Sequence, residues 1–232
     1  MSSLRRHQLH LVTEPRRGAS ELTRAVALAL EGGVDWVQLR DKSSSAASIY
    51  TDATVLLPLT EQLGAQLAIN DRLDVALAVG AQAVHLAGQS LPVDAAVRLA
   101  NSRVLVGRSV HGLDEATQAA AAGADYLTFG HVFPTTSHPG LPPRGLAELE
   151  AIVQAVDVPV LAIGGITVDN LDHVLATGCA GIAVISAILA DADPRWAASQ
   201  LRRALDASSH QPKLIFPHRR DRHAAYRQPT AV

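Results

Sequence analysis

Residues 119–130 read AAAAGADYLTFG, and this stretch contains the unit from which the chain is built. An alanine-rich helical segment stops at Gly123, and an apolar strand begins at Tyr126. Glycine is favoured at such a break because it readily adopts the left-handed conformation that ends many helices. The same entry into a strand recurs at residues 33–36 (GVDW), 80–83 (GAQA) and 178–181 (GCAG). A recurrence at intervals of about 40–50 residues indicates a repeated βα unit.

The rest of the chain continues this alternation. Apolar segments predict eight β-strands, at 8–13, 36–40, 66–70, 83–87, 104–109, 126–130, 160–164 and 181–186. Helical patterns follow them at 21–30, 46–63, 73–79, 93–100, 113–122, 145–156, 168–176 and 194–207. Pro58 is expected to interrupt the second helix, because proline lacks a backbone N–H. The pattern predicts an α/β protein, a single-domain (β/α)8 TIM barrel. An open doubly wound sheet is the alternative, but no glycine triplet of the phosphate fingerprint follows the first strand.

Composition excludes several classes of protein. The chain has 232 residues, of which 48% are hydrophobic, so it can bury a large core and is not disordered. Its net charge of −2 argues against nucleic acid as a partner. No apolar run is long enough to span a membrane, and Cys179 is the only cysteine. We expect a cytoplasmic protein, with a homo-oligomer left open.

Two regions are expected along the chain. Residues 1–208 form the barrel, and residues 209–232 form a flexible tail rich in arginine, histidine and proline. The apolar residues Leu214, Ile215 and Phe216 are expected to dock the start of this tail onto the body.

Polar residues gather where function is expected in a barrel, at the carboxyl ends of the strands and in the loops after them. The predicted binding residues are Gln38, Arg40, Lys42, Asn70, Ser109, Thr135, Gly164, Gly165, Ile185 and Ser186. The glycine pair together with Ile185 and Ser186 is the strongest signal, since loops after strands seven and eight often bind phosphate through backbone N–H groups. A tight turn that needs glycine is the alternative.

Three further features remain open from the residues alone. Arg40 and Lys42 form either a second anion contact or an ion pair with Asp41 or Asp71. Asp71 either binds Mg²⁺ or, together with Asn70, caps the helix that follows, and the cap is favoured. His131, after the sixth strand, is either a proton-transfer group or a buried structural histidine. His85, inside a strand, is interpreted as structural.

The motifs resemble those of the thiamine phosphate synthase/TenI family of (β/α)8 barrels over about residues 8–206. The matching segments are residues 37–42 (VQLRDK), 69–72 (INDR), 84–86 (VHL), 107–111 (GRSVH), 123–126 (GADY), 163–166 (IGGI) and 184–188 (VISAI). The family includes synthases that join a pyrimidine diphosphate to a thiazole phosphate, and TenI-type thiazole tautomerases.

Departures from the synthase pattern select the tautomerase hypothesis. Ser90 stands where the family's second magnesium-binding aspartate would be, and His138 stands where a lysine would meet the diphosphate. Residues 129–133 (FGHVF) resemble the tautomerases instead. The resemblance implies that His131 is catalytic and moves protons on a carboxythiazole phosphate, an isomerase reaction in thiamine biosynthesis that needs no metal or other cofactor. The expected partner is a small-molecule thiazole phosphate.

Two other hypotheses remain. The first is a thiamine phosphate synthase that uses Mg²⁺ held by Asp71. The second is a non-catalytic barrel that only binds a phosphate ligand.

Overall fold

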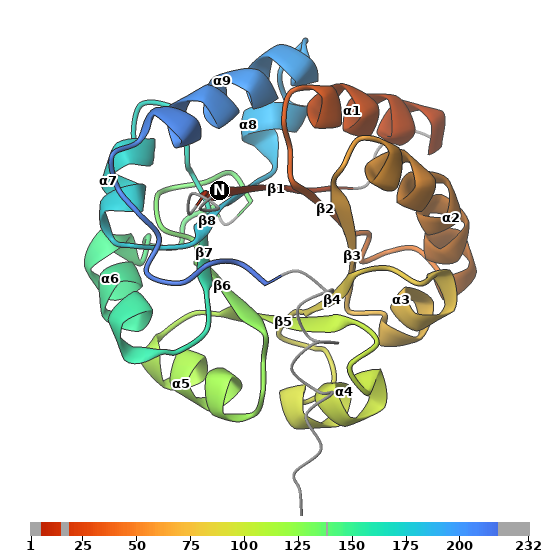
Figure 1. Ribbon diagram of the computed structural model, residues 1–232, viewed down its shortest axis with the longest axis horizontal. Helices are drawn as coiled ribbons and strands as arrows, with labels where there is room; N and C mark the ends of the chain where they lie inside the picture. The colour runs from red at the N-terminus through yellow and green to blue at the C-terminus, as the bar shows by residue number, and fades with distance from the viewer. Residues whose placement is uncertain (1–5, 15–18, 138, 218–232) are drawn as a thin grey trace, which may run out of the picture.

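The chain forms a closed parallel β-barrel surrounded by helices (Figure 1). The computed structural model describes residues 6–14, 19–137 and 139–217. The strands are β1 (Gln8–Val12), β2 (Trp36–Leu39), β3 (Gln66–Asn70), β4 (Ala83–Leu86), β5 (Leu105–Val110), β6 (Tyr126–Gly130), β7 (Val160–Ile163) and β8 (Gly181–Val184). Each pairs with its sequence neighbours, and β8 pairs with β1. The predicted single-domain (β/α)8 fold is therefore confirmed.

The helices form a ring outside the barrel (Figure 1). They are α1 (Ala19–Glu31), α2 (Ala46–Gln62), α3 (Leu73–Val79), α4 (Val93–Ala100), α5 (Leu113–Ala121), α6 (Gly145–Ala155), α7 (Leu171–Ala176), α8 (Ser186–Leu189) and α9 (Pro194–Ala207). Two expectations need correction. Helix α2 continues through Pro58, because the carbonyl that Pro58 leaves without a helical partner belongs to Thr54, which is exposed to solvent. Strand β8 ends at Val184, and Ser186 instead begins the short helix α8.

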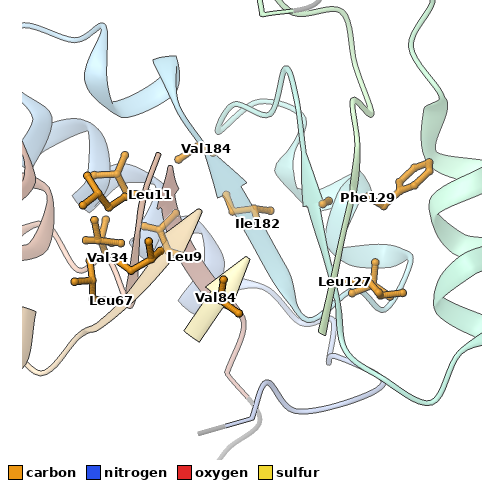
Figure 2. Close-up of a cluster of buried hydrophobic side chains, with 14 of the residues drawn as sticks. Leu9, Leu11, Val34, Leu67, Val84, Leu127, Phe129, Ile182 and Val184 are labelled. Carbon is orange, nitrogen blue, oxygen red and sulfur yellow. The ribbon is translucent and has the colours of Figure 1, made fainter. Parts of the chain in front are cut away.

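The hydrophobic core has an outer and an inner part. Successive strand residues point to opposite faces, so in β2 Val37 and Leu39 face the helices while Trp36 and Gln38 face the barrel interior. Figure 2 shows outward-facing side chains of the larger cluster on β1, β3, β4, β6 and β8. The inner cluster consists of Trp36, Ala68, Ala83, Leu105, Tyr126, Leu161, Ala180 and Phe216.

The recurrent entry into the strands has a direct structural role. Its third residue accepts a hydrogen bond from a backbone N–H of the preceding strand in three of the four units. Asp35 Oδ2 accepts from Leu9 N at 2.8 Å, Gln82 Oε1 from Leu67 N at 2.8 Å, and Asp125 Oδ2 from Val106 N at 2.6 Å. These side chains satisfy buried donors and help to set the register of adjacent strands.

The segment after α9 crosses the amino-terminal end of the barrel (Figure 1). Lys213 Nζ donates to the carbonyls of Val153, Gln154 and Val156 at the end of α6, at 2.9, 2.9 and 3.2 Å. Such a cation complements the negative end of the helix dipole. Phe216 is 1% exposed and completes the inner cluster. Residues 218–232 of the predicted tail lie outside the described residues, and the boundary at residue 208 stays a prediction.

Within the described part of the chain, no helix combines the length and the apolar character needed to cross a bilayer.

Phe216→Ala should lower the free energy of unfolding by about 3–5 kcal/mol, the usual cost of removing a buried phenylalanine side chain. The ring of Phe216 lies 4.7 Å from Tyr126 and 5.5 Å from Trp36, measured between centroids, so its loss leaves a cavity in the barrel floor. Urea unfolding followed by circular dichroism measures the change. Ile215→Ala is the matched control, since Ile215 is 53% exposed. Equal losses in the two variants would contradict the role assigned to Phe216.

Candidate active site

A cavity of about 630 Å³ opens at the carboxyl ends of the strands. It has the size of pockets that enclose small-molecule ligands, which is about 300–1,000 Å³. All of the sequence-predicted binding residues line it, namely Gln38, Arg40, Lys42, Asn70, Ser109, Thr135, Gly164, Gly165, Ile185 and Ser186. His131 lines it as well. Closure of the sheet thus brings together residues from six different strands and the loops that follow them.

The loop after β7 packs tightly against the loop after β6. Gly164 has φ +99°, and a Cβ placed there would lie 2.3 Å from the Cβ of His131. The backbone N–H of Phe133 donates to the Gly164 carbonyl at 3.1 Å. Glycine at position 164 therefore allows the positive φ angle and also lets the backbone lie close to His131. The same contact brings the two loops together at the cavity, beside the hydroxyl-bearing residue Ser186.

Two cations line the cavity without carboxylate partners. Among the residues that the structure describes, neither Arg40 nor Lys42 is within salt-bridge distance of an acidic side chain. Asp41, which lies between them, accepts hydrogen bonds from Ser43 and Ser44 instead. Partial burial opposes ionisation of Asp41, but these hydrogen bonds hold its pKa below the usual value. The ion-pair alternative is wrong, and both cations are available to an anion.

A hydrogen-bond network runs along the cavity wall from β2 to the loop after β4. Gln38 Nε2 donates to Asn70 Oδ1 at 2.7 Å, and Asn70 Nδ2 donates to Asp71 Oδ2 at 2.6 Å. Asp71 Oδ1 accepts from Ala87 N at 2.9 Å and from the Ser90 hydroxyl. The favoured helix-cap interpretation is therefore wrong, since the first residue flanking α3 is Arg72 and no side chain caps it.

Asp71, the residue that the sequence analysis considered for a metal, is hydrogen-bonded to the cavity-lining residue Asn70. Within the ranges described, no three histidine, cysteine or acidic side chains form a group that could hold an ion by themselves. Mg²⁺ is commonly bound by one or two carboxylates together with substrate phosphates and water. One carboxylate with a neighbouring hydroxyl, from Asp71 and Ser90, fits an ion held mainly by a phosphorylated substrate.

His85 has a larger part in the site than the sequence suggested. His85 is 2% exposed and lines the cavity. Nε2 lies 2.8 Å from Ser109 Oγ, and Nδ1 lies 3.3 Å from the Tyr126 hydroxyl. Burial lowers the pKa of His85 to about 4, so the ring is neutral near pH 7. The alternation of side chains along a strand could have predicted this position. His85 is two residues after Ala83 in β4, so both side chains face the barrel interior.

The histidines at the rim contact the backbone. His131 is 6% exposed, and its Nε2 lies 3.3 Å from the Leu141 carbonyl oxygen. Its own carbonyl accepts from Arg144 N at 3.0 Å. His111 Nδ1 lies 2.9 Å from the Gly130 carbonyl oxygen. His131 thus connects the end of β6 to the far end of its loop. His138, where the sequence analysis noted a missing lysine, lies outside the described residues.

The closed barrel and the large cavity at the carboxyl ends of its strands define the class, that of (β/α)8-barrel enzymes. A model of the family described as thiamine monophosphate synthase matches residues 9–188. The chain belongs to this family.

Similar proteins agree with the family match. A putative thiamine-phosphate synthase of Geobacter sulfurreducens is 44% identical over 83% of this chain and 92% of that protein. The thiamine-phosphate synthase of Roseiflexus castenholzii is 43% identical over 83% and 86% of the two chains. A solved structure of thiamine phosphate pyrophosphorylase from Pyrococcus furiosus is 39% identical, covers 87% of this chain and 96% of its own, and superposes with a TM-score of 0.79.

These relatives overturn the expectation of a thiazole tautomerase and of an isomerase. The names that they carry denote a synthase, at high identity over most of the chain. The tautomerase hypothesis gave most weight to His131 and Ser90. In the structure His131 contacts the Leu141 carbonyl, and Ser90 donates to Asp71, so both residues have structural contacts that need no proton-transfer chemistry to explain them.

Gly164→Ala should destabilise the site because the new methyl group would collide with His131. Gly140→Ala is a matched control, since Gly140 also has positive φ, at +77°, but a Cβ there meets nothing within 4 Å. The control should lose about 1–2 kcal/mol of unfolding free energy from its left-handed backbone. Gly164→Ala should lose clearly more, together with affinity for inorganic phosphate. Equal values in urea unfolding and calorimetry would contradict the close packing of the two loops.

Proposed function

We propose that this protein is a thiamine-phosphate synthase, which joins a pyrimidine diphosphate to a thiazole phosphate and releases diphosphate. The observation that carries the proposal is the 43–44% identity, over 83% of the chain, to proteins named for that activity. The cavity supports it, because a reaction between two phosphorylated substrates needs two regions that attract anions.

The first anion-binding region consists of Gly164, Gly165 and Ser186. Backbone N–H groups at glycine-rich loops and a serine hydroxyl are suitable donors for a phosphate monoester. In this proposal they bind the thiazole phosphate. That assignment leaves the two cations on β2 and its following loop for the other substrate.

The second region contains Arg40 and Lys42. In the reaction, the bond between the pyrimidine methylene carbon and a diphosphate oxygen breaks, a bond to the thiazole nitrogen forms, and the electron pair leaves with diphosphate. Negative charge therefore grows on the leaving oxygen. Arg40 offers a planar fork of donors and Lys42 a point charge, and neither forms a salt bridge with an acidic side chain among the described residues.

The interior wall provides neutral hydrogen-bonding groups for a heteroaromatic ring. Gln38, Asn70, Ser109 and Thr128 line the cavity, and the bond from Gln38 to Asn70 fixes both amides. Amides and hydroxyls match the ring nitrogens and amino group of a pyrimidine without adding charge to the interior. His131 in this proposal holds the loop that covers the cavity, through its contact with Leu141.

The proposed synthase reaction uses Mg²⁺, whereas the tautomerase hypothesis expected no cofactor. Asp71 would hold the ion, with the hydroxyl of Ser90 beside it. The ion supplies positive charge that neutralises the diphosphate. Asn70 keeps the Asp71 carboxylate oriented through its 2.6 Å hydrogen bond.

Incubation with hydroxymethylpyrimidine diphosphate, thiazole phosphate and Mg²⁺ should yield thiamine phosphate and diphosphate in equal amounts, measured by liquid chromatography with mass spectrometry. Chelation of Mg²⁺ should stop the reaction, because the diphosphate then leaves without its main counter-charge. Reactions that lack one substrate are the controls. A folded protein that binds both substrates and forms no thiamine phosphate would refute the proposal.

Arg40→Gln should lower kcat/KM by about 10–100-fold, the size of one lost hydrogen bond to a charged group. Arg98→Gln is the control, since Arg98 is an exposed residue of α4 paired with Asp94. Steady-state kinetics with the pyrimidine diphosphate varied would measure both variants. An unchanged kcat/KM in Arg40→Gln would remove Arg40 from the site.

A further inference from the structure

Three side chains form a hydrogen-bonded chain from the floor of the barrel to the cavity. The Tyr126 hydroxyl lies 3.3 Å from His85 Nδ1, and His85 Nε2 lies 2.8 Å from Ser109 Oγ. Tyr126 and His85 are 1% and 2% exposed, whereas Ser109 is partly exposed and lines the cavity. The two inner residues can therefore affect a ligand through Ser109.

Close packing fixes the inner end of this chain. Gly107 is the register partner of Tyr126, and a Cβ on Gly107 would lie 2.1 Å from Tyr126 Cζ. The opposite side of the barrel floor is filled by Phe216, whose ring centroid lies 4.7 Å from that of Tyr126. Glycine thus makes the space in which the tyrosine ring lies, and its hydroxyl is held beneath His85.

Hydrogen-bond accounting assigns a direction to the chain. A neutral imidazole has one N–H donor and one acceptor nitrogen. With the proton on Nε2, Tyr126 donates to Nδ1, Nε2–H donates to Ser109 Oγ, and the Ser109 proton points into the cavity. With the proton on Nδ1, the Tyr126 O–H has no acceptor among the described residues. A buried hydroxyl without an acceptor is costly, so the first arrangement is favoured.

We propose that Tyr126 and His85 are positioning residues that orient the Ser109 hydroxyl as a hydrogen-bond donor to the substrate. The inference rests on the proposed function for the identity of that substrate, whose acceptor is a lone pair of the pyrimidine diphosphate. The direction is opposite to that in a serine nucleophile, where histidine accepts the serine proton. Ser109 in this arrangement binds substrate and does not attack it. Successive donation also polarises the outer hydroxyl and strengthens its bond to an acceptor.

The tautomer of His85 tests the direction without reference to activity. In protein labelled with ¹⁵N-histidine, NMR at pH 7 should show His85 with its proton on Nε2, and His85→Asn identifies the signal by its loss. Tyr126→Phe removes the donor to Nδ1, so the Nε2–H population should fall. Tyr50→Phe, on the exposed surface of α2, should leave the signal unchanged. A wild-type ring with its proton on Nδ1 would overturn the proposal.

A double-mutant cycle tests whether Tyr126 acts through Ser109. Ser109→Ala should lower kcat/KM about tenfold, and Tyr126→Phe about threefold to tenfold. In the Ser109→Ala background, Tyr126→Phe should have no further effect on kcat/KM. A merely structural tyrosine would lower it by the same factor in both backgrounds, and that result would overturn the positioning role. Thermal unfolding of each variant verifies that it is folded.

Binding measurements identify the acceptor. Calorimetry with inorganic diphosphate and with hydroxymethylpyrimidine, each on the wild type and on Ser109→Ala, assigns the lost affinity to one half of the substrate. No loss with either half would contradict donation by Ser109. If the protein makes no thiamine phosphate, the proposed function fails, while the His85 tautomer still decides the orientation of Ser109.

Discussion

Closure of the sheet between β8 and β1 is the constraint on which the site depends. At this seam the backbones approach so closely that a Cβ on Gly181 would lie 2.2 Å from the carbonyl oxygen of Gln8. Because all eight strands are parallel, their carboxyl ends lie on one side, and closure bends this edge into a ring around the cavity. As a result Arg40 and Ser186, which are far apart in the sequence, line the same cavity. In an open sheet with the same strand order, the two predicted anion-binding regions, after β2 and after β7 and β8, would lie far apart along the carboxyl edge.

The barrel interior is divided by polarity along its axis. Trp36, Tyr126 and Phe216 fill the amino-terminal end, where water is excluded. Neutral amides, hydroxyls and the uncharged His85 follow above them, and the cations Arg40 and Lys42 lie towards the rim. This order follows from the cost of burying charge, which is lowest where solvent still reaches the side chain. A ligand with an aromatic ring and an anionic group matches it, ring inward and anion at the rim.

The sequence predicted the elements well because each rests on local periodicity and on glycine at the helix ends. It also predicted the residues of the cavity, since strand ends in a closed barrel share one edge. Contacts between residues that are distant in the sequence were harder to predict. The hydrogen bonds from Asp71 to Ala87 and Ser90 depend on how two loops meet, and nothing in their spacing excludes a helix cap. The sequence predicted that residues 214–216 contact the body of the protein. It did not predict that Phe216 lies inside the barrel floor.

The error in the functional interpretation has a physical cause. The identity of His131 constrains the chemistry of one position only, and its buried ring is packed against Gly164. Identity of 44% over 83% of the chain reflects many positions at once, including the framework that orients every side chain of the cavity. The histidine also has a use that is independent of catalysis, because its ring contacts the Leu141 carbonyl across the loop after β6. A motif at a single loop is therefore weaker support for an activity when its residues already satisfy one another in the fold.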